Sequence, residues 1–441
     1  MRIIVRYLAA VVLFAAAVTS SFANEFEAGA GSRSAVNRWR SDRINIAISR
    51  SLLTSTSNFK AGTDVESALK RAIARWESVA NVHFSVSESR RRNASPAGAR
   101  GDGESLITIA QTSENLALFQ PGDTSISAKT RVFTDRNGFV TEADIVLNPY
   151  ASFSTDGSYA TYDLEGVLTH EIGHLLGLRH SQIMGSVMHG NVDINSTIGP
   201  GFAFRKALSA EDIASVRALY GAATESEACC GEVRGRLLPT EVSLAGSLIL
   251  LEDKNGEIAA GKRFEGNGEF IFGGLSAGTY AVLVARDGVG TLAEDLGTVS
   301  VESRSTTHFE AKPVAELTPF ELTYVGADGL LSTSAVKLLP GSTTLMTIGG
   351  RGLDSSQLAI FTSSPFIRID ESSLSDLDYA ENVSAIRFQI TVDEKAASGS
   401  YSIFVQSPSG ELAVLPGAIS VTKSVWIIGF VHHPGEHCHK K

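Results

Sequence analysis

The chain has only three cysteines among its 441 residues, too few for the dense disulfide framework of a small secreted scaffold. Cys229 and Cys230 are adjacent, and Cys438 lies far from both. Three states stay open on the sequence alone: a bridge from one of the adjacent cysteines to Cys438, a vicinal disulfide, or unpaired thiols. The cysteines therefore do not define the fold.

An excess of positive charge is also absent. The sequence contains 38 lysines and arginines against 48 aspartates and glutamates, which gives a formal net charge of −10 at pH 7. This balance argues against binding to nucleic acids or anionic membranes, because both carry negative charge. The small basic cluster Arg90–Arg92 is interpreted as a solvated part of a loop.

No apolar run is long enough to span a membrane. Arg2 and Arg6 precede the short apolar stretch Leu8–Val18, and Ser21–Ala23 offers small residues for cleavage. These features are typical of a secretory signal peptide covering residues 1–23. Near the other end, Val425–Val431 is far too brief to cross a bilayer. We therefore expect an exported protein, secreted to the extracellular space or the periplasm.

One motif carries most of the chemical information. His170 and His174 lie one helical turn apart on the same face, so both imidazoles can reach one metal ion. Gly177 can end this helix in the left-handed conformation, which lets the chain turn back and bring in His180 as a third ligand. Three protein ligands leave the fourth zinc position open for water, as in catalytic sites. Glu171 is then placed to accept a proton from that water.

A second motif follows the third histidine. The stretch Ser186–Gly190, here called the Met-turn, places Met188 eight residues after His180. The two motifs together resemble those of the metzincins, whose long zinc motif is followed by a methionine-containing turn beneath the metal. The resemblance implies that Met188 packs under the three histidines as a hydrophobic base and does not bind the ion.

Within the metzincins, the chain resembles the matrixins. Ser181 follows the third histidine, and Ala207–Gly221 looks like the matrixin closing helix. Ser209 is a favourable N-cap for this helix, and Glu211 and Asp212 suit its positive N-terminal end. This resemblance implies a zinc-dependent endopeptidase with one catalytic zinc ion, acting on protein or peptide substrates.

The residues upstream predict a mixture of strands and helices. Ile44, Ile46 and Ile48 alternate with polar or small residues, as in a half-buried strand. Thr63 and Glu66 are expected to form a capping box for a helix. The apolar face of this helix contains Val65, Leu69, Ile73, Trp76 and Val79. Further strand-like runs are Val82–Val86 and Leu106–Ala110.

Two later stretches complete this part of the prediction. Leu116–Pro121 resembles the edge strand along which matrixins bind an extended peptide. Asp135–Gly138 is a hairpin signal, and Ala143–Asn148 is its returning strand. The fold predicted for residues 37–222 is an α/β metzincin-like catalytic domain, with a mixed sheet plus the zinc helix.

The sequence after this domain shows a different residue pattern. Short alternating runs separated by glycine turns predict strands at Val233–Leu237, Ser247–Leu251, Gly268–Phe272, Tyr280–Val284 and Gly399–Val405. We expect two all-β sandwich domains. Residues 228–313 resemble carboxypeptidase-regulatory-like or prealbumin-like modules, and residues 316–422 resemble immunoglobulin-like modules of the IPT/TIG type. They are either spacers or sites for an extracellular matrix or surface ligand.

Other cation sites are weaker candidates. Asp135, Glu142 and Asp144 could bind Ca²⁺, although hairpin and solvent-facing roles explain them better. The tail, residues 423–441, is rich in metal-binding side chains, namely His432, His433, His437, Cys438 and His439. A flexible terminus without supporting contacts would bind transition metals only weakly.

The resulting hypothesis is a secreted zinc endopeptidase with Glu171 as general base. One alternative is an exported adhesion or binding protein whose zinc domain is not proteolytic, and binding without cleavage would distinguish it. The other is a zinc hydrolase that acts on bonds other than peptide bonds.

Overall fold

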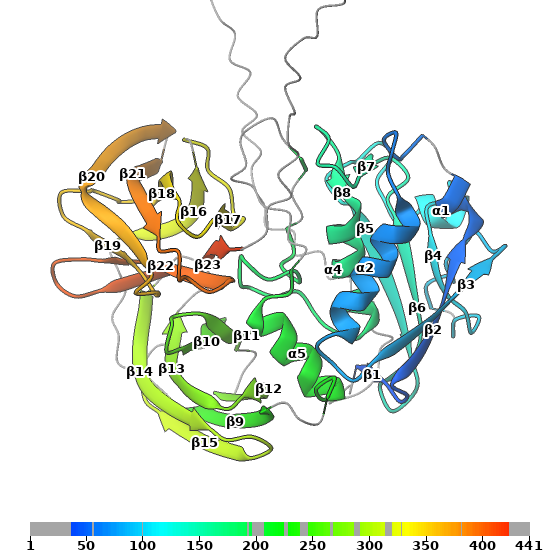
Figure 1. Ribbon diagram of the computed structural model, residues 1–441, viewed down its shortest axis with the longest axis horizontal. Helices are drawn as coiled ribbons and strands as arrows, with labels where there is room; N and C mark the ends of the chain where they lie inside the picture. Colours follow the sequence, from blue (N-terminus) through cyan, green and yellow to red (C-terminus); the bar gives the residue numbers. More distant parts are fainter. Residues whose placement is uncertain are drawn as a thin grey trace, which may run out of the picture.

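The computed structural model describes residues 37–422, apart from residues 55–56, 99, 192–193, 196–206, 225–227, 239–245, 265–267, 286–291, 314–319, 328 and 381. The predicted signal peptide and the histidine-rich tail lie outside the described residues. No helix in the described ranges is long and apolar enough to cross a membrane. We call residues 37–224 the N-terminal part and residues 228–422 the β region (Figure 1).

The N-terminal part combines strands and helices. Its strands are β1 (Arg38–Trp39), β2 (Arg43–Ser49), β3 (His83–Ser89), β4 (Ser105–Thr108), β5 (Ala128–Thr134), β6 (Phe139–Leu147), β7 (Phe153–Ser154) and β8 (Tyr162–Asp163). Its helices are α1 (Arg50–Thr54), α2 (Val65–Glu77), α3 (Ser113–Leu116), α4 (Leu164–Leu175) and α5 (Ala210–Tyr220). This mixture agrees with the predicted α/β domain.

A six-stranded sheet forms the frame of this part. Its strand order is β1-β6-β4-β2-β3, and β5 pairs with β6 as the single antiparallel member. The isoleucines predicted for the first strand, Ile44, Ile46 and Ile48, are all buried in β2. They belong to the same core as the apolar faces of α2 and α4. The hydrophobic effect therefore holds both helices on the sheet.

Helix α2 has the predicted apolar face but a different cap. Asp64 is the N-cap, and its carboxylate accepts a hydrogen bond from the Ser67 amide at 2.9 Å. The predicted capping box of Thr63 and Glu66 is therefore wrong. Glu66 instead accepts a hydrogen bond from Lys70 one turn later, at 2.7 Å. The N-cap is therefore Asp64, one residue after the predicted Thr63.

Helices α2 and α4 are joined by polar as well as apolar contacts. Arg71 and Arg75 both donate to the buried carboxylate of Glu165, at 2.6 and 2.5 Å. The Trp76 indole donates to the Thr169 carbonyl at 2.9 Å. These contacts fix the position of α4, the helix that carries the histidine motif, along the helix packed beside it.

The edge strand of the sheet lies elsewhere than predicted. Leu116–Pro121 is not a strand: Leu116 ends the short helix α3, and the chain continues as a turn. The antiparallel edge is β5, the first arm of the hairpin at Asp135–Gly138, which the sequence did predict. The polar residues before Leu116 form a helical turn capped by Thr112, and this local preference prevails.

The β region contains strands in every stretch where the sequence predicted one. They are β9 (Cys229–Leu237), β10 (Leu248–Asp253), β11 (Ile258–Arg263), β12 (Glu269–Ser276), β13 (Gly278–Ala285), β14 (Leu292–Val301), β15 (Thr306–Ala311), β16 (Glu321–Ala327), β17 (Val336–Leu338), β18 (Thr343–Arg351), β19 (Ala359–Thr362), β20 (Ile367–Ala380), β21 (Val383–Val392), β22 (Gly399–Gln406) and β23 (Leu412–Val421).

One sheet runs through both halves of the β region. Its order is β11-β10-β13-β14-β23-β22-β19, with β17 also paired to β23. The join is the antiparallel pairing of Leu292 with Ala413 and Ala293 with Leu412. Smaller sheets, β12-β9-β15 and β16-β18-β21-β20, accompany it. The region is rich in strands, as expected, but the shared sheet connects the two predicted sandwiches.

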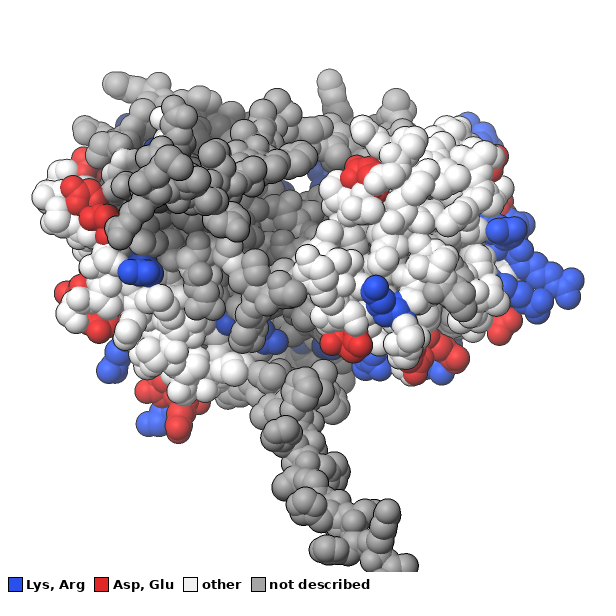
Figure 2. Space-filling model, turned by 90° about the horizontal axis from the view of Figure 1, so that it is seen from above, with Lys and Arg blue, Asp and Glu red and all other residues white. Residues whose placement is uncertain are grey.

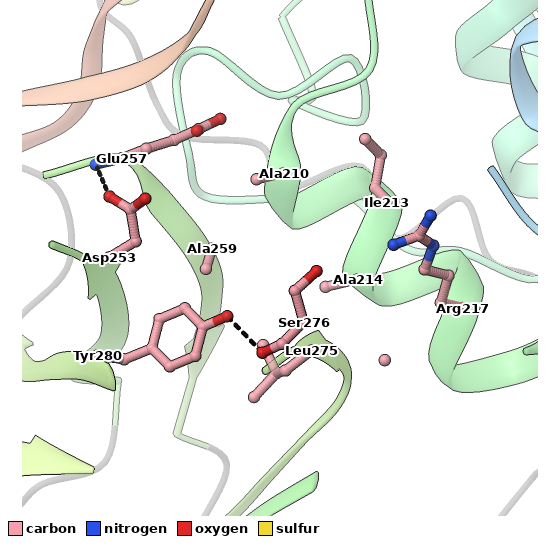
Figure 3. Close-up of a pocket in the computed structure, with 11 residues that line it drawn as sticks. Ala210, Ile213, Ala214, Arg217, Asp253, Glu257, Ala259, Leu275, Ser276 and Tyr280 are labelled. Atoms are coloured by element: carbon pink, nitrogen blue, oxygen red, sulfur yellow. Dashed lines mark hydrogen bonds between the residues drawn. The ribbon is translucent and has the colours of Figure 1, made fainter. Parts of the chain in front are cut away.

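Helix α5 is part of the contact between the N-terminal part and the β region. The backbone at Gly274 approaches α5 so closely that a Cβ there would lie 2.1 Å from the Ala214 carbonyl oxygen. Beside this contact lies a cavity of about 240 Å³, in which Ile213 and Arg217 of α5 lie across from Glu257 and Tyr280 (Figure 3).

Charged side chains of both signs are scattered around the face seen in Figure 2.

The two adjacent cysteines form a disulfide. Cys229 and Cys230 are bonded to each other at the start of β9, and the peptide bond between them is cis. Of the states left open by the sequence, the structure contains the vicinal disulfide.

The sheet core predicts a sharp contrast between two paired residues. Ile46 and Val86 are register partners in β2 and β3, but they are 1% and 46% exposed. We expect Ile46→Ala to lower the free energy of unfolding by about 2–5 kcal/mol, because it leaves a cavity. Val86→Ala should change it by less than about 0.5 kcal/mol. Urea unfolding followed by tryptophan fluorescence measures both, and equal losses would contradict the assigned core.

Candidate functional site

Helix α4 presents two of the three predicted ligands. Asp163 caps its N-terminus by accepting from the Gly166 amide at 2.8 Å, and Gly177 lies just beyond its C-terminal end with a φ of +98°. A Cβ at Gly177 would lie 1.7 Å from the Asn37 carbonyl oxygen, so both the conformation and the space require glycine. The chain turns back there, as predicted.

The three predicted histidines come together. One ring nitrogen each of His170, His174 and His180 lies within 4.8 Å of the others. His170 is buried, His174 is half-buried and His180 is exposed, so the group opens to solvent on the side of His180. In the described residues, this is the single cluster of three or more potential metal ligands.

Backbone carbonyls orient the two helical histidines. Nδ1 of His170 lies 2.7 Å from the Val187 carbonyl oxygen, and Nδ1 of His174 lies 2.8 Å from that of Leu178. Since a carbonyl can only accept, each Nδ1 carries the proton and each Nε2 keeps its lone pair. The two Nε2 atoms face each other at 3.0 Å. Two lone pairs at this distance repel unless a cation lies between them.

The donor set fits zinc. Two nitrogens bound to one tetrahedral zinc ion at ~2.0–2.1 Å lie about 3.3 Å apart, close to the observed separation. The pKa of His174 is lowered to about 3, first by burial and then by the neighbouring His180. The imidazole is therefore neutral at physiological pH, as a metal ligand must be.

Glu171 is held beside the histidines by the edge strand. Its carboxylate is buried and accepts a hydrogen bond from the Thr130 hydroxyl at 2.5 Å. Thr130 lies in β5, so the same strand borders the site and orients the carboxylate. The sequence did not single out Thr130, because a hydroxyl in a strand carries no signal of a partner 41 residues away.

The Met-turn touches the histidine motif at three points. The Val187 carbonyl contacts His170, and the Met188 sulfur lies so close to Gly173 that a Cβ there would be 2.2 Å from it. A Cβ on Gly190 would lie 3.4 Å from Nδ1 of His180. Met188 is buried and packs against Gly173 of α4.

Asp212 connects the Met-turn to α5. Its buried carboxylate accepts from the Ser186 hydroxyl at 2.5 Å and from the Val187 and Met188 amides at 2.9 and 3.3 Å. It also accepts from the Ser209 amide at 2.8 Å, which closes a capping box. The sequence predicted the Ser209 cap correctly but assigned Asp212 only to the helix dipole.

Glu211 is a second buried carboxyl at this junction. Burial, and then the neighbouring Asp212, raise the pKa of Glu211 well above its ordinary value of 4.5. One of its oxygens, Oε2, has no hydrogen-bond partner among the described residues. Glu211 is therefore protonated over much of the physiological range.

The carboxylates proposed as calcium ligands accept hydrogen bonds from backbone amides or pair with Arg40. Asp135 pairs with Arg40 at 2.7 Å in the hairpin turn, and Glu142 accepts from the Gly103 amide at 2.5 Å. Asp144 accepts from two backbone amides, and burial raises its pKa to about 7. Asp135 has the expected hairpin role, whereas the solvent-facing role expected for Glu142 and Asp144 is wrong, because each is only 1% exposed.

Sequence comparison places this site in a known family. Residues 38–221 match the family model of the matrixins. Metalloendoproteinase 2-MMP of Arabidopsis thaliana is 34% identical over 164 residues, 36% of this chain and 38% of that protein. Metalloendoproteinase 1 of Glycine max is 27% identical over 165 residues, 35% of this chain and 45% of that protein. Interstitial collagenase of Equus caballus is 27% identical, with coverages of 36% and 28%.

The chain thus spans less than half the length of these relatives. Among solved structures, SGBP-B of the Bacteroides ovatus mixed-linkage glucan utilization locus is 13% identical. The alignment covers 40% of this chain and 37% of that chain, with a TM-score of 0.14. Such a low score carries no conclusion about the β region.

Asp212 is expected to be essential for the Met-turn. Asp212→Asn keeps the volume but leaves several buried donors without an acceptor, so we expect a loss of about 2–4 kcal/mol in the free energy of unfolding. Ser215→Ala, one turn later in α5, should cost less than about 0.5 kcal/mol. Urea unfolding measures both, and a neutral Asp212→Asn would exclude the anchoring role.

Glu211 predicts a pH dependence. A carboxyl that stays protonated in the folded protein binds more protons than the unfolded chain does above pH 4.5. The free energy of unfolding should therefore fall as pH rises from about 5 toward the raised pKa, by at most about 1.4 kcal/mol per pH unit. Glu211→Gln, which mimics the neutral acid, should flatten this fall in urea unfolding at pH 5, 6, 7 and 8. Identical slopes would contradict the buried neutral state.

Proposed function

Residues 38–221 are a matrixin domain, and from this premise we propose that the protein is a zinc-dependent endopeptidase. The observation that carries the proposal is the convergence of His170, His174 and His180 beside the buried carboxylate of Glu171. Both helical imidazoles donate from Nδ1 to a backbone carbonyl and direct Nε2 toward a common point.

The three histidines would hold the zinc ion. When bound, the ion supplies Lewis acidity, which polarises a substrate carbonyl and makes water more acidic. The carbonyls of Val187 and Leu178 keep the rings of His170 and His174 in the required tautomer. The proposal needs no other protein ligand.

Glu171 acts as the general base. It takes a proton from the attacking water and then delivers a proton to the leaving amine nitrogen. The Thr130 hydroxyl donates to one carboxylate oxygen, Oε2, and thereby fixes the direction in which the other oxygen points. A positioned base of this kind needs no rearrangement when substrate binds.

Strand β5 is the proposed substrate edge. Within the described part of the sheet it pairs only with β6, so its outer edge can pair with an extended peptide. Thr130 lies in this strand, which places a peptide bound along β5 close to Glu171. Protein or peptide chains are therefore the proposed substrates.

Location and further partners are proposals as well. The predicted signal peptide supports secretion to the extracellular space or periplasm. The β region would then face an extracellular matrix or surface ligand. The alternative of an adhesion protein with a non-proteolytic zinc domain is less favoured, because the three histidines converge and Glu171 directly follows the first of them on the same helix.

Cleavage of casein by the purified protein tests the proposal. We expect cleavage that a zinc chelator abolishes. Glu171→Gln should keep stoichiometric zinc but lower turnover by about 10²–10⁴-fold, because the general base is lost. His174→Ala should lose zinc by elemental analysis, and Glu66→Gln on the exposed face of α2 should behave as wild type.

Two outcomes would contradict this assignment. Wild-type turnover by Glu171→Gln would remove the general base. Stoichiometric zinc without cleavage of casein or of a peptide library would favour the binding protein instead.

A further inference from the structure

The segment between the third histidine and the Met-turn is buried by the β region. Ile183 and Met184 are 0% and 1% exposed. Every other member of the core around Ile183 belongs to β10, β11, β13, β14, β22 or β23. The core around Met184 otherwise consists of residues between Phe320 and Val421. We call Gln182–Gly185 the docking segment.

Polar contacts fix the docking segment on the same surface. The Met184 amide donates to the Pro416 carbonyl at 3.0 Å, and Arg263 donates to the Gln182 side chain at 3.0 Å. Beyond the Met-turn, the Asn191 side chain donates to the Thr333 hydroxyl at 2.7 Å. The segment is therefore held in one register along the shared sheet.

Glycines on both sides allow this close approach. A Cβ at Gly185 would lie 2.2 Å from the Ser400 hydroxyl oxygen. A Cβ at Gly417 would lie 2.6 Å from Cγ2 of Ile183, and one at Gly261 would lie 2.7 Å from its Cδ1. Any side chain at these positions forces a neighbour to move. The fit thus depends on glycine backbones packed directly against the side chains of Ile183 and Ser400.

The docking segment is rigidly linked to the metal ligands. The Ser186 amide donates to the Ile183 carbonyl at 3.0 Å, and the Ser181 amide donates to the Met188 carbonyl at 2.9 Å. A shift of Ile183 would therefore move both ends of the loop that lies against His170 and His180. His180 is the most sensitive of them, because it lies outside any helix and is exposed.

We propose that the β region is a positioning scaffold for the metal centre, acting through Ile183 and Met184. The docked segment keeps His180 and the Met-turn in place, so zinc affinity and turnover both depend on the shared sheet. The effect on turnover rests on the proposed peptidase function, whereas the effect on zinc affinity does not. Ile183 and Met184 are positioning residues, since neither belongs to the ligand set.

The first test compares two buried isoleucines in the full-length protein. Ile183→Ala removes the contact with the sheet, whereas Ile249→Ala removes an equally buried isoleucine of β10 that belongs to a separate core without the docking segment. We expect Ile183→Ala to weaken zinc affinity about 10–100-fold, as loss of support around metal ligands does, and Ile249→Ala to leave it unchanged. Competition with a chromogenic chelator measures affinity, and cobalt(II) absorption reports ligand geometry.

The second test exchanges single methyl groups, so that folding is retained. Gly261→Ala adds a methyl only 2.7 Å from Cδ1 of Ile183, and Ile183→Val removes that Cδ1. Gly261→Ala alone should weaken zinc affinity and lower kcat with little change in KM. The double variant should restore both, because Ile183→Val removes the atom that the added methyl meets first. Urea unfolding of the same variants separates this effect from a loss of general stability, since zinc affinity should change while the protein stays fully folded.

Wild-type zinc affinity and cobalt spectra in Ile183→Ala and Gly261→Ala would overturn the inference. So would an equal loss of zinc in Ile249→Ala, because the effect would then be one of general stability. The metal measurements need no turnover. A protein that binds zinc but cleaves nothing would therefore contradict the proposed function while these variants still decide the inference.

Discussion

The site depends on keeping three imidazoles at one point although only two of them share a helix. The Nε2 atoms of His170 and His174 lie 3.0 Å apart, so the two rings must be held in one fixed orientation to face the same point. For His170 and His174, the helix and two carbonyls provide that constraint. For His180, which lies outside the helix, the constraint comes from the loop between Ser181 and Gly190.

That loop is fixed from two directions. On one side Asp212 accepts from a hydroxyl and two amides of the Met-turn, and it joins them to α5. On the other side Ile183 and Met184 are inserted into the cores of the β region. A loop usually positions side chains less precisely than a helix, and these two anchors reduce that difference. The peptidase proposal and the scaffold inference both use this arrangement.

Much of the fold followed from local pattern. The alternation of Ile44, Ile46 and Ile48 and the helical spacing of Leu69, Ile73 and Trp76 predicted elements correctly because burial imposes a period of 2 or 3.6. The predicted edge strand, Leu116–Pro121, is not formed because the polar residues before it favour a helical turn capped by Thr112. The cap at Asp64 was missed by one residue for a similar reason: several polar residues compete for the same amides.

The sequence by itself determined the proposed ligand set, the carboxylate that follows its first histidine and the turn at Gly177, because those residues lie within a few positions of one another and helix geometry fixes their relation. Only the tertiary structure decided that Thr130 orients Glu171, that Asp212 holds the Met-turn, and that the β region buries Ile183. These contacts join residues far apart in the chain, where periodicity tells which face is apolar or polar but not which surface it will meet.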